Sequence, residues 1–231
     1  MKRCVARLSM FASLAIGLAG ASVAQSFNID ADNEFAPPEL GGGVPDDSFG
    51  AAANQKGHWV KYDASGNAPF ALRGLDGELT NVIFSGPTAG IANGFNNPEN
   101  TRGFAALLND GRTFGNDTWT FSGLKNGPYR LFSYAARPSN IVTNTRVFVP
   151  GAVIEELFVT GPMPGNAFEI GKTHSIHDIV VNAGRFSITI TEGQSSAYLN
   201  GFQLVAVVPE PASVIALSLG IWVGMRRRRT R

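Results

Sequence analysis

The chain has 231 residues, of which 44% are hydrophobic and 16% charged, and its formal net charge is +1. Between Gln25 and Val208 the balance is acidic, with 11 basic and 17 acidic residues, because the other basic residues lie near the two ends. This balance argues against the clustered basic surface that a nucleic-acid partner requires. An acidic region of this kind is compatible with calcium binding or with simple solubility.

The chain opens with a charged and then apolar segment. Three basic residues precede the apolar stretch 8–19, and Ser22-Val23-Ala24 follows it. This order is typical of a secretory signal peptide, so residues 1–24 are expected to form a signal helix that is removed on export. Cys4, the only cysteine, would leave with it, so the exported part would contain no disulfide and no cysteine metal site.

Short runs with two-residue alternation, separated by Gly, Pro and Asn turns, fill the middle of the chain. Helical spacing is confined to 103–109. The turn Asn182-Ala183-Gly184 predicts a hairpin between the two runs that flank it. The predicted strands, in chain order, are 27–30, 58–62, 79–84, 118–121, 129–136, 146–149, 153–159, 174–181, 185–191 and 199–208.

This pattern of roughly eight to eleven short strands favours two antiparallel sheets that bury their apolar faces against each other. No internal repeat is visible, which argues against a propeller or a solenoid. We therefore expect an all-β protein with an antiparallel jelly-roll β-sandwich over residues 25–206.

The tail, residues 207–231, has a composition of its own. An acid between two prolines leads to an uncharged apolar run, 212–225, and then to a basic block. A helix over this run would be about 21 Å long, against about 30 Å for the hydrocarbon core, and snorkelling arginines would help it to span. We expect a C-terminal transmembrane helix with its basic end on the cytoplasmic side. The basic block consists of Arg226, Arg227, Arg228, Arg229 and Arg231.

The tail resembles the PEP-CTERM sorting signal of exported bacterial proteins, with the motif at Pro209, Glu210 and Pro211. The resemblance covers about the last 23 residues. It implies an inner-membrane anchor that exosortase, an integral-membrane transpeptidase-like enzyme, processes near the motif. The protein would then reach the cell surface or the extracellular matrix. An ordinary single-pass anchor is the alternative.

The predicted sandwich resembles galactose-binding-like domains of the malectin and carbohydrate-binding-module neighbourhood. The fragments that carry this likeness are Phe27-Asn28-Ile29-Asp30, the G-L-x-x-G-x-Y entry at 123–129, and Tyr198-Leu199-Asn200-Gly201-Phe202. The resemblance implies a jelly roll, in which sugar binding is common but not universal.

Two candidate catalytic or metal patterns appear on predicted strands. His174, His177 and Asp178 spell H-x-x-H-D, but strand residues three apart point to opposite faces, so the two imidazoles would not meet at one ion. Glu155 and Glu156 are adjacent, so on a strand they also point to opposite faces and could not act together as an acid-base pair. No nucleophile elbow is present. We therefore assign no catalytic, cofactor or metal residue and predict that the chain is not an enzyme.

Calcium has a different set of candidates. Asp30, Asp32, Glu34, Asp46 and Asp47 offer hard oxygen ligands, and the resemblance implies that a structural calcium often accompanies this fold. Their spacing fits no EF-hand loop. The preferred interpretation is a solvated acidic loop.

Aromatic residues decide whether a sugar could stack on the surface. Trp119 and Trp59 are expected in the core from their strand context, which leaves Tyr62, Tyr134 and Tyr198 as candidates for an exposed platform. Three functions fit these observations: a noncatalytic surface or matrix protein that binds polysaccharide, a glycan-active hydrolase or lyase, and a purely structural or adhesive matrix protein. Burial of every tryptophan would favour the last.

Overall fold

The structure is a computed structural model that describes residues 25–32, 37, 42–63, 69–88, 91–137, 142–193 and 197–207. The predicted signal peptide, Glu34, the sorting motif and the arginine block lie outside these residues. Within the described ranges, no helix is long and apolar enough to cross a membrane.

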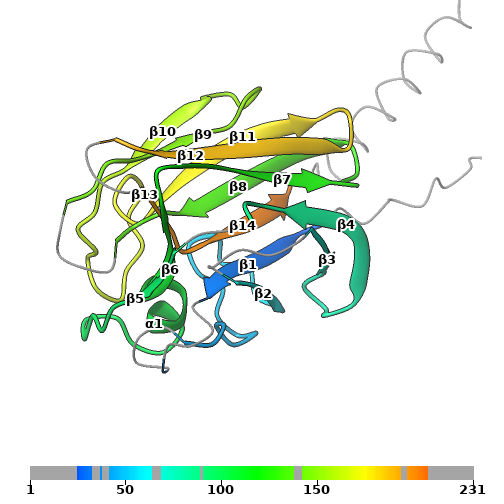
Figure 1. The fold of residues 1–231 in the computed structure, drawn as a ribbon. Coiled ribbons are helices and arrows are strands. Elements are labelled where there is room, and N and C mark those ends of the chain that lie inside the picture. Colours follow the sequence, from blue (N-terminus) through cyan, green and yellow to red (C-terminus); the bar gives the residue numbers. More distant parts are fainter. Residues whose placement is uncertain are drawn as a thin grey trace, which may run out of the picture.

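Two sheets face each other and form a β-sandwich, which confirms the all-β antiparallel fold (Figure 1). The only parallel pair among the described strands is β1 with β2. In sheet order, the five-stranded sheet consists of β11 (His174–Val181), β8 (Gly127–Tyr134), β14 (Gly201–Ala206), β1 (Phe27–Asp32) and β2 (Trp59–Asp63). The six-stranded sheet consists of β10 (Glu156–Val159), β9 (Thr145–Phe148), β12 (Arg185–Glu192), β7 (Asn116–Ser122), β4 (Leu79–Ser85) and β3 (Phe70–Arg73).

A third, three-stranded sheet and one short helix stand at one end of the sandwich. The sheet contains β13 (Ala197–Leu199), β6 (Asp110–Phe114) and β5 (Ile91–Gly94), and the helix is α1 (Gly103–Leu108). The helix was predicted, whereas β3, β5, β6 and the separate β13 were not. These strands are short, and β6 begins Asp-Gly-Arg, so they lack an apolar alternation long enough to recognise.

Aromatic side chains join the two sheets across the core. Phe84 of β4 lies 6.0 Å and Trp119 of β7 lies 5.9 Å from Phe202 of β14, measured between ring centroids. Trp119 and Trp59 are both buried, as predicted. Because alternate residues of a strand point to opposite faces, the same strands leave polar side chains on the outside.

The predicted hairpin at Asn182-Ala183-Gly184 is wrong. Strands β11 and β12 exist at the expected places, but β11 belongs to the five-stranded sheet and β12 to the six-stranded one. The turn therefore crosses from one layer to the other, as does the turn between β7 and β8. The backbone N–H of Leu124 donates to the carbonyl oxygen of Gly184, which ties the two crossings together.

Two predicted strands have different bounds in the structure. The strand expected over 153–159 begins only at Glu156, and Val153 and Ile154 before it are exposed. The strand expected over 199–208 divides at Asn200, whose side chain donates to the carbonyl oxygen of Asp110 and accepts from the backbone N–H of Ala136. The backbone of Asn200 bonds to Tyr134 and Ala31 of the five-stranded sheet, while its side chain ties the junction between β13 and β14 to the neighbouring segments.

The segment 45–58 covers the outer face of the five-stranded sheet. A buried amide network holds it there: Gln203 donates to Asn28 and to the carbonyl oxygen of Gly50, and Gln55 donates to Asn28. The Tyr134 hydroxyl donates to Gln203 and accepts from the backbone N–H of Ala52. Tyr134 thus has its polar end satisfied inside the protein.

Candidate functional site

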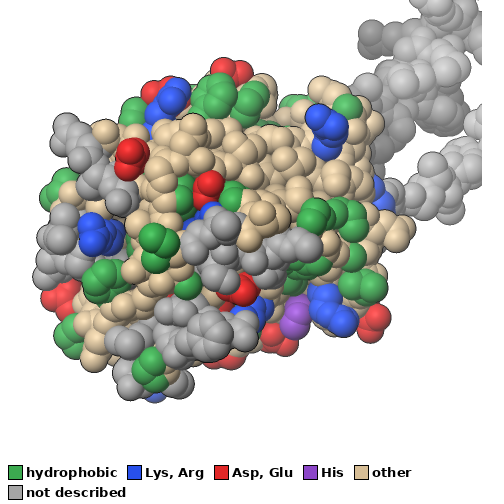
Figure 2. Space-filling model, viewed as in Figure 1, with side chains coloured by type: hydrophobic (Ala, Val, Ile, Leu, Met, Phe, Trp, Pro, Cys, Tyr) green, Lys and Arg blue, Asp and Glu red, His purple; other side chains and the backbone are tan. Residues whose placement is uncertain are grey.

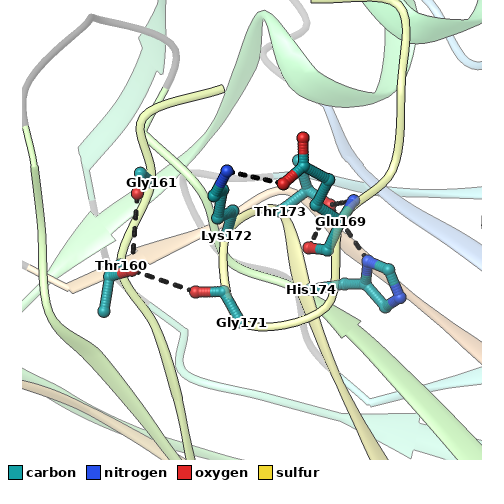
Figure 3. Close-up of polar contacts among 7 residues, drawn as sticks. All are labelled: Thr160, Gly161, Glu169, Gly171, Lys172, Thr173 and His174. Atoms are coloured by element: carbon teal, nitrogen blue, oxygen red, sulfur yellow. Dashed lines mark hydrogen bonds and ion pairs between the residues drawn. The ribbon is translucent and has the colours of Figure 1, made fainter. Parts of the chain in front are cut away.

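The two histidines of the H-x-x-H-D pattern do not converge. His174 lies on the outer face of β11, where its ring packs 5.9 Å from Phe132 and 5.7 Å from Tyr134. Its Nδ1 is 3.0 Å from the Thr173 hydroxyl, in a turn that the Glu169–Lys172 ion pair also closes (Figure 3). His174 is therefore a packing residue of this turn.

His177 occupies the inner face of the same strand, opposite Leu131 of β8. Burial lowers the pKa of both His174 and His177 to about 4, because a charged imidazole would lose its hydration there. Both rings are consequently neutral at neutral pH. The described residues contain no group of three His, Cys, Asp or Glu side chains that could hold a metal ion.

The other charged pattern consists of surface contacts. Glu155 accepts a hydrogen bond from the backbone N–H of Gly151, and Glu156 forms an ion pair with Arg146 on the neighbouring strand. The two carboxylates thus have separate partners and face different directions.

The acidic residues considered for calcium divide into two places. Asp30 and Asp32 share the outer face of β1, where Asp32 pairs with Lys61 at 3.0 Å and accepts from the backbone N–H of Gly43. Asp30 is fully buried, and neither carboxylate oxygen has a hydrogen-bond partner. Burial and the neighbouring Asp32 raise the pKa of Asp30 well above its usual range. Asp46 and Asp47 lie in the loop beyond Gly43.

The three tyrosines that were candidates for an exposed sugar platform are buried. Tyr62, Tyr134 and Tyr198 are each no more than 1% exposed, and their hydroxyls bond inside the protein. Together with the two buried tryptophans, this leaves no exposed Tyr or Trp among the described residues. An aromatic residue facing inward is as compatible with two-residue alternation as one facing outward, so the sequence pattern did not separate the two.

A polar cleft of about 510 Å³ opens between the loop 42–46 and the segment 96–106. We call it the polar cleft. Its lining combines amide, hydroxyl, guanidinium and carboxylate groups with apolar atoms, which form the larger part of its surface. These residues are Gly42, Gly43, Val44, Pro45, Asp46, Asn96, Asn100, Thr101, Arg102, Gly103, Ala105 and Ala106.

An aromatic cluster fixes the two walls of the polar cleft relative to each other. Phe49 comes shortly after the loop 42–46 in the chain, and Phe104 belongs to the segment 96–106. Their ring centroids are 5.2 Å apart, and Phe168 stacks on Phe104 at 4.7 Å. Gly103 is required for this packing, because a Cβ there would approach the Phe49 ring to 2.4 Å. The bond from Gly43 to Asp32 anchors the first wall to β1.

The polar groups of the cleft are held by their own local contacts. Asn100 donates to the Asn109 side chain at 2.8 Å, while its Oδ1 is buried without a hydrogen-bond partner. The Thr101 backbone N–H donates to Asn166. Arg102 has a φ of 52°, in the left-handed region that costs about 1 kcal/mol or more for a residue with a Cβ. Hydrogen bonds from Ser48 lower the pKa of Asp46, which keeps this carboxylate ionised.

A second hollow, of about 390 Å³, lies where residues 25–27 meet the turn 74–80. Asp76 and Glu78 line it, and Asp76 accepts from the backbone N–H of Glu78. Both carboxylates are exposed and belong to one turn. This differs from the convergence of carboxylates from distant strands that the hydrolase alternative required.

Sequence reasoning missed the polar cleft. Asp46 was considered for calcium, whereas Asn96, Asn100 and Arg102 were not considered at all. The signal available was the cluster of Asn and Gly residues at 93–103, which was visible only as loop composition. No spacing rule relates that loop to Asp46.

No family model matches the chain, and no curated protein matches it. Among solved structures it is similar to Bacteroides uniformis β-glucuronidase 2, with a TM-score of 0.43, 15% identity, and coverage of 71% of this chain and 17% of that one. It is similar to the exo-β-1,3-galactanase of Phanerochaete chrysosporium, with a TM-score of 0.27, 23% identity, and coverage of 41% and 23%. It is also similar to the CBM35 of Cellvibrio japonicus Abf62, with a TM-score of 0.29, 14% identity, and coverage of 52% and 78%.

The chain thus spans less than a fifth of the β-glucuronidase. The prediction that this chain is not an enzyme is contradicted by these likenesses, because two of the three structures named are glycoside hydrolases.

Proposed function

We propose that this chain is an exported bacterial surface or matrix protein whose jelly-roll sandwich binds a saccharide in the polar cleft. The observation that carries the proposal is the lining of that cleft, which gathers amide, guanidinium and carboxylate side chains at one opening. Sugar hydroxyls both donate and accept, so Asn96, Asn100, Arg102 and Asp46 could each bond to one or two of them. The volume suits a ligand of one or two sugar rings.

Asn100 supports this proposal further. Its buried Oδ1 lacks a hydrogen-bond partner, and an unpaired buried acceptor costs about 1–3 kcal/mol. A ligand hydroxyl that donates to this oxygen would recover that cost. The described lining of the polar cleft contains no aromatic ring, which favours recognition through hydrogen bonds over stacking.

Glycan-array binding of the full-length protein in detergent tests the polar cleft. Arg102→Ala is expected to weaken binding of the best saccharide about tenfold or more, since a charged hydrogen bond contributes about 1.5–3 kcal/mol. Arg73→Ala, an exposed arginine at the end of β3, serves as the matched control and should bind normally. Release of reducing sugar from the same saccharides shows whether binding is followed by hydrolysis. Equal binding by both variants would sink the proposed site.

The tail supports the proposal of export and sorting. We expect an exosortase to act near Pro209, Glu210 and Pro211 after the apolar run has held the chain in the inner membrane. Glu210→Gln removes the charge of the motif and should leave the chain in the membrane fraction of an exosortase-bearing cell. Mass spectrometry of the C-terminal peptide is the measurement. An unchanged C-terminus and location in cells lacking exosortase would instead indicate an ordinary anchor.

A further inference from the structure

The outer face of the six-stranded sheet carries a field of hydroxyl groups, which we call the hydroxyl face. Their neighbours along the strands, such as Trp119 on β7 and Ile188 and Ile190 on β12, are fully buried, so the hydroxyl-bearing residues point outward. The members come from three adjacent strands. They are Ser85 of β4, Thr118, Thr120 and Ser122 of β7, and Ser187, Thr189 and Thr191 of β12.

Strand register places these hydroxyls in rows. Thr118 stands opposite Thr189, with 3.0 Å between their Oγ1 atoms, and Thr120 stands opposite Ser187, with 2.9 Å between the hydroxyl oxygens. Ser85 extends the second row on the other side of Thr120. Each bonded pair shares one hydrogen, so it still offers one donor and three lone pairs to a ligand. The bonds also fix the side-chain rotamers.

The hydroxyl face differs in charge from an ordinary solvent-facing sheet. Threonine is a favoured strand residue in itself, but exposed strands of soluble proteins usually intersperse Lys and Glu, which keep them from associating. On 118–122 and 187–191 every outward side chain is an uncharged hydroxyl, and the charged neighbours stand at the edges, with Arg185 opposite Ser122 and Arg146 opposite Thr191. Figure 2 shows a broad tan area over β7 and β12, the colour of uncharged polar side chains and backbone.

Aromatic rings border the hydroxyl face on β9 and β10. Phe148 stands opposite Thr189, and the Arg146 guanidinium lies 5.5 Å from its ring centroid. Phe158, opposite Arg146, is 42% exposed. An exposed ring beside hydroxyl groups offers both the apolar surface and the hydrogen bonds that a sugar ring presents in return.

We infer that the hydroxyl face binds a neutral polysaccharide chain, which crosses β7 and β12 and ends its contact on Phe158. Strands spaced about 4.8 Å apart, with outward residues about 6.7 Å apart along each strand, present hydroxyls at regular intervals to a polymer of regular repeat. Over the hydroxyl rows an acidic polymer would lose hydration without gaining a charged partner, because Arg185 and the Arg146–Glu156 ion pair lie only at the edges of the face. The surface is separate from the polar cleft, so the two proposals can fail independently.

Sedimentation of the full-length protein in detergent with insoluble cellulose and with β-1,3-glucan particles tests this inference, and alginate beads supply an acidic polymer. The Thr118→Val/Thr189→Val variant keeps the β-branched shape of both residues but removes their hydroxyls. It should bind at least one of the neutral polymers about tenfold more weakly, as should Phe158→Ala. Thr113→Val, on β6 and away from this face, is the matched control and should bind as the unmodified protein does.

Near-UV circular dichroism establishes that each variant retains its fold before binding is measured. The inference is overturned if the unmodified protein sediments with neither neutral polymer, if it sediments with alginate alone, or if the threonine variant binds at full strength. If the Arg102→Ala variant no longer binds a soluble saccharide but still sediments with the particles, the hydroxyl face and the polar cleft are independent binding sites.

Discussion

At the scale of single residues, Asp30 is the group most at odds with its surroundings. It is fully buried on β1, has no hydrogen-bond partner, and lies beside a second carboxylate, Asp32. Its raised pKa means that the folded protein holds a proton there more tightly than the unfolded chain does. The resulting contribution to stability is complete below the unfolded pKa and is lost as the pH rises.

Asp30→Asn is therefore expected to stabilise the protein at pH 8, by roughly 1–3 kcal/mol, because it removes the carboxylate that must otherwise stay protonated or buried without a partner. The gain should shrink toward pH 4, where aspartic acid is already neutral. Thermal melts at both pH values, in EDTA and in calcium, measure this. A calcium-dependent rise in melting temperature that the variant abolishes would instead establish the calcium site considered from the sequence.

At the scale of elements, the irregular segment 45–58 links the five-stranded sheet to the polar cleft. It covers the outer face of the five-stranded sheet and continues from the loop that forms one wall of the polar cleft. Its hold on the sheet passes through Gln203 and Asn28, whose amide groups bond to each other at 2.8 Å and to the backbone of the segment. Stability and binding should therefore be coupled through Gln203.

Gln203→Leu tests this coupling, because leucine fills a similar volume without making any of these hydrogen bonds. We expect a loss of about 2–4 kcal/mol, since several buried partners are left unsatisfied, together with weaker saccharide binding in the polar cleft. Chemical denaturation and the glycan array provide the two measurements. Gln25→Leu, whose side chain accepts from the backbone N–H of Lys125 and takes no part in this network, is the control. Reduced stability with unchanged binding would show that the cleft wall does not depend on this network.

At the scale of the whole molecule, the two sheets use their outer faces differently. One, the five-stranded sheet, is covered over β1 and β14 by the segment 45–58, while its Arg130–Asp178 ion pair stays half exposed. The other is open and presents hydroxyl groups on β7 and β12 with an aromatic border on β9 and β10. The polar cleft lies beside the covered sheet. The proposed saccharide and polysaccharide sites thus occupy different parts of the surface, so one glycan chain need not satisfy both.

Much of the fold follows from the sequence. The alternation of apolar and polar residues identified most of the long strands, and strand context placed Trp119 and Trp59 in the core. A strand that packs on one side must have its apolar residues at every second position. The spacing of Phe104, Leu107 and Leu108 located α1. The signal peptide and the sorting tail are likewise predictions from local order and composition, and they concern residues outside the described ranges.

The tertiary structure decided which strands share a sheet and where the polar cleft lies. Alternation specifies the faces of a strand but not its partner, so β11 and β12 were expected to pair although each belongs to a different layer. The cleft depends on Asp46 and Arg102, which are brought together by packing among Phe49, Phe104 and Phe168. Contacts between residues so distant in sequence leave no periodic signal. The spacing of apolar residues reflects only the geometry of the strand or helix to which they belong, and not the segments that pack against it after folding.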